Sequence, residues 1–301
     1  MLYRYLDAER LASFARQHEV RLVHSSDLWL GAYLNWVAKR LKIPSILHVR
    51  TPIRSDQVRK HYCGGASSII AISKRIRRNL LDAGIAPEKV TLIDDAADLH
   101  LFGANRTEVN VLRRDFSPTS QVLVGIVGRI NSSKRQLDFL KAAEQITRDS
   151  ATNVTFFVIG EVHSQSYFDK INRFVSKNGL KRHVFFTGRR DDMPQVLRSL
   201  DVLVSLSGGS VMFEAMACGK PVISAGFSSK EDSVHIQDER TGLLVSSRRT
   251  TELVEAAIRL IKAPQLRRQI GREARKWAEN RLSHINMAAK TQQLYRQLLQ
   301  D

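Results

Sequence analysis

Short runs of Val, Ile, Leu and Phe alternate with amphipathic segments along almost the whole chain. The runs predict strands at residues 21–24, 45–49, 68–72, 90–93, 122–127, 154–159, 183–187, 202–206, 221–224 and 243–245. They are almost continuously apolar, as expected of strands buried on both faces of a sheet. The segments between them, such as residues 28–41, 74–83, 134–147 and 167–178, have the periodicity of amphipathic helices. This alternation is typical of right-handed βαβ units, so we predict a doubly wound α/β fold with parallel sheets.

The alternation weakens in the polar residues 98–120, where we place a domain boundary. This predicts an N-terminal domain at residues 1–104 and a second domain at residues 105–282. From residue 251 onward the pattern is helical, and prolines and polar residues break it into about three helices. We expect the last of them, at residues 283–301, to pack back on the N-terminal domain.

Composition is that of a globular protein of about two domains, since the chain has 301 residues and 43% of them are hydrophobic. Cys63 and Cys218 are the only cysteines, too few for a disulfide framework or a structural zinc site. The chain begins without the basic and apolar layout of a signal peptide, and no run of about 18 apolar residues occurs. We therefore expect a cytoplasmic protein.

The chain is strongly basic, with 47 Lys and Arg against 30 Asp and Glu, a net charge of +17. Between residues 39 and 78 the basic residues are dense, and Asp56 is the only acid. Three interpretations remain open: a generally cationic solvated surface, contact with an anionic membrane, or nucleic-acid binding. No zinc-finger spacing and no aromatic, glycine-rich strand motif is present, so a nucleic-acid partner is not expected.

The first candidate site follows the predicted strand at residues 122–127. Gly128 ends that strand, Arg129 follows it, and Lys134 comes five residues later at an expected helix start. Ligands of open α/β sheets bind beyond the carboxyl ends of the strands, and two cations near a helix start suit a diphosphate. The alternative is a polar loop whose cations are merely solvated.

The second candidate site is a glycine pair followed by a short predicted helix. Paired glycines allow backbone N–H groups to approach a ligand closely, and the helix start offers further donors. Glu214 lies four residues after the expected helix start and can accept hydrogen bonds from sugar hydroxyls. The alternative is a helix with one exposed Glu. The candidate binding residues are Gly208, Gly209, Ser210, Val211 and Glu214.

His24 and His48 lie at or near strand ends in the first half and are candidate site residues, although a lone histidine is more often packed or solvated. No His, Asp or Glu cluster has the spacing of metal ligands, so no metal is expected. Neither a Walker loop nor a Gly-x-Gly-x-x-Gly motif occurs, so ATP hydrolysis and nicotinamide redox chemistry have little support.

Together these segments resemble the family-four retaining glycosyltransferases, which have the GT-B fold of two facing Rossmann-like domains. The resemblance covers the chain from about residue 18 to the end, and its most specific part is residues 214–223, EAMACGKPVI. It implies that Glu214 contacts the ribose of a nucleotide-sugar and that Arg129 and Lys134 bind the donor diphosphate. It also implies that His48 faces the transferred sugar. Further similar segments are residues 44–48, 68–73, 89–102 and 241–245.

Two departures from the family pattern affect the expected activity. Leu206 stands where the family usually has a second Glu that binds the donor sugar. The chain also begins at an amphipathic helix rather than at a strand with a glycine-rich loop, so we expect a shortened N-terminal domain. A nucleotide-sugar-binding protein without transferase activity is therefore the main alternative to an enzyme.

The resemblance predicts transfer of a sugar from a nucleotide diphosphate-sugar to an acceptor hydroxyl, with retention of the anomeric configuration. Arg129 and Lys134 would neutralise the leaving diphosphate, so neither a metal nor another cofactor is expected. His48 would act on the acceptor side, with His24 a weaker candidate. By analogy, the acceptor would be a glycan or a lipid-linked molecule of polysaccharide or lipopolysaccharide assembly. The basic first half would hold the protein on the anionic inner face of the membrane.

Overall fold

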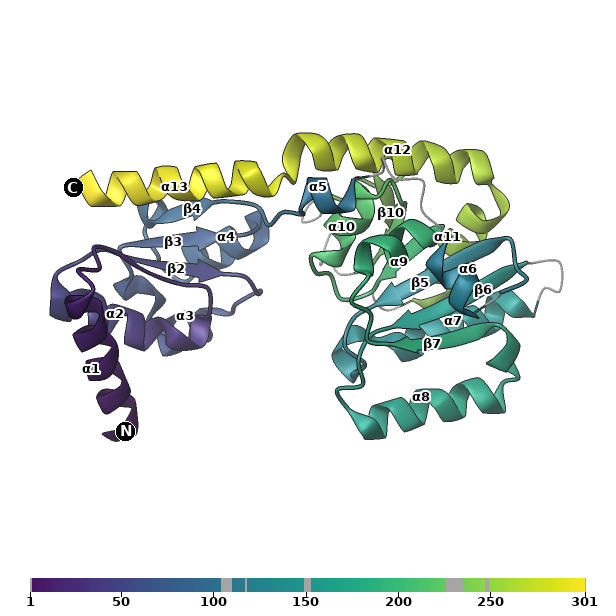
Figure 1. Ribbon diagram of the computed structural model, residues 1–301, viewed down its shortest axis with the longest axis horizontal. Coiled ribbons are helices and arrows are strands. Elements are labelled where there is room, and N and C mark those ends of the chain that lie inside the picture. The colour runs from purple at the N-terminus through teal and green to yellow at the C-terminus, as the bar shows by residue number, and fades with distance from the viewer. Residues whose placement is uncertain are drawn as a thin grey trace. The chain divides into compact units, whose positions relative to one another are not determined.

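The computed structural model describes residues 2–103, 110–116, 118–148, 153–225, 235–246 and 249–300, with the side chains of residues 2–5 left undescribed. The chain forms two compact units, Met1–Asp95 with His284–Asp301 and Ala96–Ser283 (Figure 1). Each unit is a parallel sheet with helices, which confirms the predicted α/β class. The predicted boundary at residues 104 and 105 lies outside the described residues. The described residues 96–103 belong to the second unit, because α5 (Leu99–Phe102) packs on α10 (Val211–Ala217).

The first unit has a four-stranded parallel sheet in the order β1-β2-β3-β4. Its strands are β1 (Val23–Ser25), β2 (Ser45–Val49), β3 (Ser68–Ala71) and β4 (Val90–Leu92). Its helices are α1 (Leu2–Gln17), α2 (Gly31–Leu41), α3 (Ser55–Lys60), α4 (Lys74–Asp82) and α13 (His284–Gln300).

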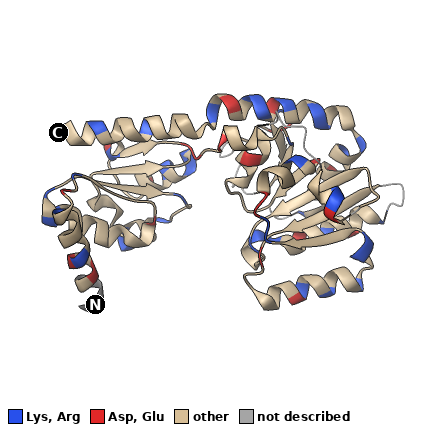
Figure 2. Cartoon of the chain, in the orientation of Figure 1, with Lys and Arg blue, Asp and Glu red and all other residues tan. Residues whose placement is uncertain are grey.

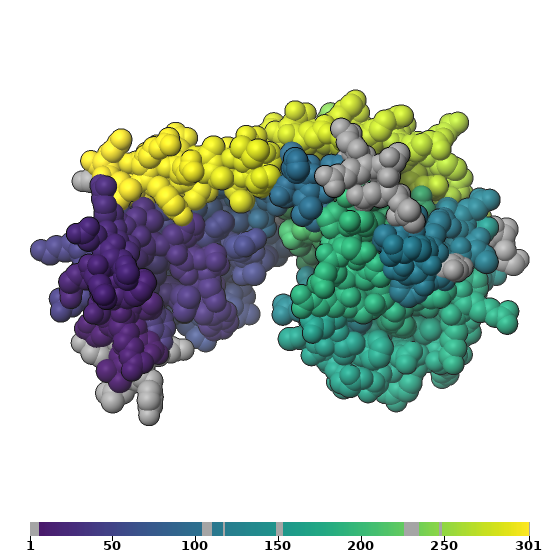
Figure 3. Space-filling view, in the orientation of Figure 1, coloured from purple at the N-terminus to yellow at the C-terminus, as the bar shows by residue number. Residues whose placement is uncertain are grey.

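Alternate side chains of this sheet enter two cores. Leu47 and Val49 of β2 pack with residues of α2 and α4, whereas Ile46 faces the other way and packs with Leu294 of α13. The last helix thus belongs to the first unit, and Figure 3 shows its residues, in yellow, lying along that unit. Both faces of the sheet are therefore covered, as its continuously apolar strands require.

The second unit has a six-stranded parallel sheet in the order β10-β9-β8-β5-β6-β7. Its strands are β5 (Val122–Val127), β6 (Val154–Ile159), β7 (Val184–Gly188), β8 (Val202–Ser205), β9 (Val222–Ser224) and β10 (Gly242–Leu244). Besides α5 and α10, its helices are α6 (Val111–Phe116), α7 (Gln136–Thr147), α8 (Gln165–Lys177), α9 (Met193–Ser199), α11 (Thr250–Lys262) and α12 (Pro264–Arg281).

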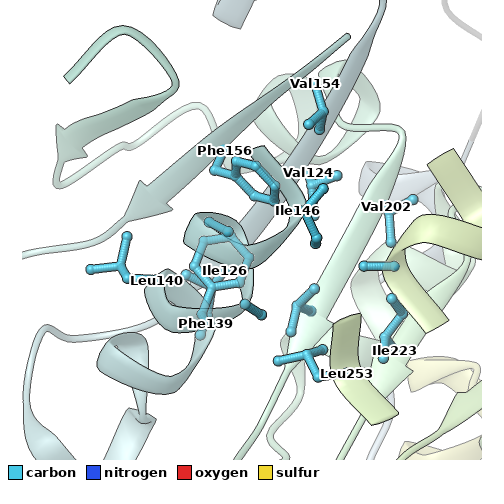
Figure 4. Close-up of a cluster of buried hydrophobic side chains, with 14 of the residues drawn as sticks. Val124, Ile126, Phe139, Leu140, Ile146, Val154, Phe156, Val202, Ile223 and Leu253 are labelled. Carbon is cyan, nitrogen blue, oxygen red and sulfur yellow. The ribbon is translucent and has the colours of Figure 1, made fainter. Parts of the chain in front are cut away.

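Helices cover both faces of this larger sheet. Figure 4 shows Phe139 and Leu140 of α7 in one cluster with Val124 and Ile126 of β5. Leu123 of the same strand belongs to the cluster on the opposite face. Burial of both faces fixes β5 at the centre of the unit, so the loop that follows it has a rigid support.

Two predicted helices start later than their sequence patterns suggest. The segment expected to be helical from residue 134 begins as a 3-10 turn, Ser132–Lys134, and α7 starts only after Arg135, which has a left-handed φ of 60°. The segment at residues 28–41 likewise opens as a 3-10 turn, Leu28–Leu30, and the carboxylate of its N-cap residue Asp27 accepts a hydrogen bond from the Trp29 N–H.

Candidate functional site

Gly128 and Gly160 follow the adjacent strands β5 and β6, and their backbones are in close contact. The Gly128 N–H donates to the Ile159 carbonyl at 2.9 Å. A Cβ placed on Gly160 would lie 2.2 Å from the Gly128 carbonyl oxygen, and both residues have φ near 150°. Such a conformation suits glycine, so these strand ends can meet only because neither residue has a side chain. The sequence analysis singled out Gly128 but missed Gly160, which also comes directly after an apolar run.

The side chain of Lys134 joins the two glycine segments that the sequence presents separately. Its Cγ, Cδ and Cε lie 3.3 to 3.5 Å from the position that a Cβ of Gly128 would occupy. Its Nζ lies 3.9 Å from the corresponding position on Gly209. Lys134 forms no ion pair or hydrogen bond with any residue that the structure describes. The structure thus places an uncompensated ammonium between two glycine loops.

The loop that carries Arg129 is held by two residues that the sequence analysis did not single out. Gln136 is fully buried, and its Nε2 donates to the Arg129 carbonyl at 3.0 Å. Arg135 donates from Nε to Asp138 at 2.8 Å and from Nη1 to the Leu206 carbonyl at 3.4 Å. The Arg129 side chain is exposed and makes no ion pair within the described part of the chain. The backbone of the loop is therefore fixed, and one cation on it is uncompensated.

The predicted helix start after the glycine pair is confirmed. Gly208 and Gly209 have φ of 73° and 121°, Ser210 occupies the N-cap position, and α10 begins at Val211. The N–H groups of Met212 and Phe213 donate to the Gly209 and Ser210 carbonyls, whereas those of Ser210 and Val211 have no partner among the described residues and are available to a ligand near Gly209. Glu214 lies one turn into α10 and is half-buried. Its contact with a ribose stays a prediction.

Leu206, which stands in place of the expected carboxylate, is a core residue. Its side chain is 4% exposed and packs in the cluster around β5. It therefore offers the donor site a backbone carbonyl, already used by Arg135, and no polar side chain.

His24 and His48 lie together in the first unit, on the neighbouring strands β1 and β2. Their ring centroids are 5.6 Å apart, and His24 Nδ1 is 2.5 Å from Oη of Tyr295 on α13. The Nε2 atoms of both rings are buried without a hydrogen-bond partner among the described residues. Burial lowers the pKa of His24, and burial together with His24 and Arg50 lowers the pKa of His48 to about 4, against an opposing effect of Asp95. Both imidazoles are consequently neutral at pH 7.

Arg50 is the exposed charged group at the carboxyl end of β2, and the sequence analysis noted it only as part of the basic stretch. Its Nη2 lies 3.2 Å from each carboxylate oxygen of Asp95. An Arg directly after an apolar strand was the pattern that could have identified it, because strand ends carry the ligands in this fold.

Neither the cysteines nor metal-ligand clusters add a further site. Cys63 and Cys218 are buried and free, and burial raises the pKa of each thiol to about 11. Within the described ranges, no group of three or more His, Cys, Asp or Glu could hold a metal ion. The described helices include none with the length and apolar character needed to cross a membrane.

Comparison with known families gives two matches that together span most of the chain. The family described as Glycosyl transferases group 1 matches residues 112–277, and Glycosyltransferase Family 4 matches residues 1–101. The D-inositol 3-phosphate glycosyltransferase of Rhodococcus opacus is 27% identical over 286 residues, covering 86% of this chain and 63% of that protein. This chain thus spans less than two thirds of that relative's length.

Solved structures show the same architecture. Anabaena Alr3699/HepE, crystallised with UDP, has a TM-score of 0.86 at 21% identity, covering 96% of this chain and 82% of that one. A glycosyltransferase from Rickettsia africae has a TM-score of 0.85 at 17% identity, covering 98% and 81%. These likenesses show the GT-B fold.

Proposed function

The chain belongs to the glycosyl transferases of group 1, and on this premise we propose that it transfers a sugar from a nucleotide diphosphate-sugar to an acceptor hydroxyl. The observation that carries the proposal is the position of Lys134. Its ammonium has no partner among the described residues and lies between Gly128 and Gly209, where backbone can approach a diphosphate closely. The UDP and UDP-glucose bound to Alr3699/HepE support this type of donor.

Charge stabilisation is the chemical contribution of the second unit. As the bond between sugar and diphosphate breaks, negative charge grows on the leaving diphosphate. Lys134 and Arg129, with the N–H groups at Ser210 and Val211, neutralise this charge. Glu214 binds the ribose, and Gly128, Gly208 and Gly209 let the backbone come close. Two resident cations supply the charge that a divalent metal would otherwise bring, so the transfer is metal-independent and needs no cofactor.

The first unit supplies the acceptor side. His48 and, more weakly, His24 contact acceptor or sugar hydroxyls as neutral imidazoles, because their lowered pKa keeps them uncharged. The transfer retains the anomeric configuration, in line with the resemblance to the retaining family. The acceptor is a glycan or a lipid-linked molecule used in cell-surface polysaccharide or lipopolysaccharide assembly.

A peripheral position on the inner face of a membrane follows from the charge of the chain. Figure 2 shows Lys and Arg distributed over both units, and the stretch at residues 39–78 has Asp56 as its only acid. Co-sedimentation with vesicles rich in anionic lipid should fall steeply as salt rises, because screening shortens the range of the attraction. Equal binding to neutral vesicles would contradict this location.

The test of the enzymatic proposal is a turnover assay with UDP-, GDP- and ADP-sugars and a panel of hydroxylated acceptors. We expect nucleotide release that persists in excess chelator and a product with the donor's anomeric configuration by NMR. An inverted product or a strict metal requirement would contradict the mechanism.

A nucleotide-sugar-binding protein without transferase activity is the second candidate. The buried side chain of Leu206 favours it, since that position offers the donor sugar no carboxylate. Calorimetric binding of a nucleotide-sugar without turnover on any acceptor would support this candidate. Absence of nucleotide binding would overturn both.

A further inference from the structure

A pocket of about 170 Å³ lies at the carboxyl ends of β1 and β2 within the first unit. The segment after β1 contributes Trp29, the segment after β2 contributes Arg50 and Thr51, and α3 with the residue after it contributes Gln57 and His61. Adjacent parallel strands present their carboxyl ends at the same edge of a sheet, which is where open α/β sheets bind ligands. The pocket is therefore placed to hold a ligand, and it is made without any residue of the second unit.

Arg50 offers this pocket unused hydrogen-bond donors in a fixed orientation. Only its Nη2 contacts Asp95, at 3.2 Å from both oxygens, while Nε and Nη1 have no partner among the described residues. The guanidinium side chain is 48% exposed, whereas that of Asp95 is 16% exposed. The carboxylate thus holds Nη2 and orients the guanidinium, while the Nε–H and Nη1–H groups stay free to donate. Each can make a charge-assisted hydrogen bond to an oxygen of a carboxylate or phosphate.

The other polar groups of the pocket are consistent with an anion beside an apolar body. Trp29 is 66% exposed and its ring lies edge-on to His61, with centroids 4.5 Å apart. The Gln57 side-chain oxygen accepts from the Arg54 N–H, which leaves its amide group as a donor. Asp27 also lines the pocket, and its Oδ1 is taken up by the Trp29 N–H.

Charge around the pocket favours an anionic ligand. Residues 39–78, the segment that carries Arg50, are rich in Lys and Arg with Asp56 their only acid, and that acid is paired to Arg54 at 3.0 Å, while Asp27 adds one negative charge to the pocket lining. A positive surface of this kind raises the local concentration of anions.

We propose that this pocket binds the anionic group of the acceptor, a carboxylate or a phosphate held by the free N–H donors of Arg50. The proposal rests on the proposed function, since it specifies the substrate class of the acceptor side. It makes Arg50 a specificity-determining residue that selects acceptors bearing a negative charge over neutral hydroxyl compounds.

The experiment uses the full chain labelled with fluorotryptophan, because Trp29 lines the pocket and its fluorine resonance reports binding there. The protein is titrated with glycerol 3-phosphate, glycerate or glycerol at constant ionic strength. The three ligands then differ mainly in the anionic group. We expect the phosphate or the carboxylate compound to shift the Trp29 resonance and glycerol to leave it unchanged. The anion that binds with the lower dissociation constant shows whether the pocket prefers a phosphate or a carboxylate.

Variants test whether Arg50 carries the binding. We expect Arg50→Gln to weaken it about tenfold to a hundredfold, as loss of charge-assisted hydrogen bonds predicts, and Arg50→Lys to recover only part of it. Arg59→Gln is the matched control, since Arg59 is an exposed cation of the same basic stretch without a partner in the described chain. Asp27→Asn keeps the cap of the 3-10 turn and removes a negative charge from the pocket, so anion binding should tighten. Weaker binding in Asp27→Asn would indicate that the carboxylate holds a neutral hydroxyl compound and would contradict the proposal.

The donor site provides the check that separates the two proposals. Lys134→Met should leave the Trp29 response intact, and Arg50→Gln should leave nucleotide binding measured by calorimetry intact. Equal shifts with glycerol, or an unchanged response in Arg50→Gln, would overturn the acceptor inference while nucleotide binding still tests the proposed function. Loss of the Trp29 response in Lys134→Met would place the anion at the donor site and also overturn it.

Discussion

Replacing Lys134 with Met isolates the charge on which the proposed donor site depends. The methionine side chain keeps carbon and sulfur atoms over Gly128, where the lysine methylenes now lie 3.3 to 3.5 Å from the glycine's Cβ position. Only the ammonium near Gly209 is lost. Because no described residue pairs with that ammonium, its removal leaves no carboxylate unsatisfied.

We expect Lys134→Met to weaken nucleotide binding and to leave the stability of the fold nearly unchanged. A hydrogen bond to a charged group contributes about 1.5 to 3 kcal/mol. At about 1.4 kcal/mol for each factor of ten, the dissociation constant of a nucleoside diphosphate should rise about 10- to 150-fold. The free energy of unfolding should change by no more than about 0.5 kcal/mol, as is usual for a surface substitution that breaks no contact.

Calorimetry with UDP, GDP and ADP, followed by urea denaturation, measures both quantities on the same protein. Lys141→Met is the matched control, because Lys141 is an exposed cation on α7 with no partner in the described chain. Unchanged nucleotide affinity in Lys134→Met would refute the donor site. An equal loss in both variants would show that only the general positive field matters.

Three further predictions concern the scaffold. Gly160→Ala should lower the free energy of unfolding by at least about 2 kcal/mol in urea, since the new Cβ would lie 2.2 Å from the Gly128 carbonyl oxygen at a φ of 145°. His48 has a pKa of about 4 when folded against an ordinary 6.5, so its protonation favours the unfolded chain. Its contribution to stability is complete above pH 6.5 and falls toward pH 4, and His48→Gln should flatten the melting temperature over that range. Tyr295→Phe removes the hydrogen bond to His24 Nδ1 and should cost about 1 kcal/mol in urea.

Two of these substitutions, at Gly160 and His48, have a matched comparison within the chain. Gly179→Ala also places an alanine at a positive φ, but in open space, so it should cost clearly less than Gly160→Ala. His100→Gln is the matched histidine substitution at an exposed position, with which the melting profile of His48→Gln is compared. An equal loss of unfolding free energy in Gly160→Ala and Gly179→Ala would contradict the close approach of the strand ends. If the melting temperature of His48→Gln changed with pH as it does in the wild type, the lowered pKa of His48 would be contradicted.

The sequence predicted the central strands best, because burial on both faces gives them an unbroken apolar run. β2, β5 and β6 begin and end where the apolar pattern does. The first strand, predicted at residues 21–24, is instead Val23–Ser25, because its pairing with β2 starts at Val23 opposite Ser45. The ends of an edge strand are set by where its backbone pairs with the neighbouring strand. The pattern of polar and apolar side chains does not show where that pairing starts.

The composition of the proposed donor site was predictable, but the proximity of its parts was not. Gly128, Lys134 and the glycine pair were each singled out by residue type. Their meeting follows from direct pairing of β5 with β8, which brings the loops after those strands together. Strand order in a parallel sheet depends on how the helices pack, so spacing along the chain does not fix it. The return of the last helix to the first unit was expected, but the contact between His24 and Tyr295, which are 271 residues apart, depends on the rotation of α13 against the sheet, which the sequence pattern does not fix.

The net charge of +17 is a poor guide to where this protein binds anions, because many of its cations are already engaged. Arg190 bridges Asp115 and Asp192 at 2.7 and 2.6 Å, and such a group gains little from a further anion. Lys141 is unpaired but lies on an exposed helix face, where it would have to lose conformational freedom to hold a ligand. Lys134 differs from both, since it is unpaired and its methylenes already rest on a glycine. Because Lys134 is already partly ordered in the folded chain, an anion that binds there costs less conformational entropy. For this reason we propose the donor site at this lysine rather than in the densest basic stretch.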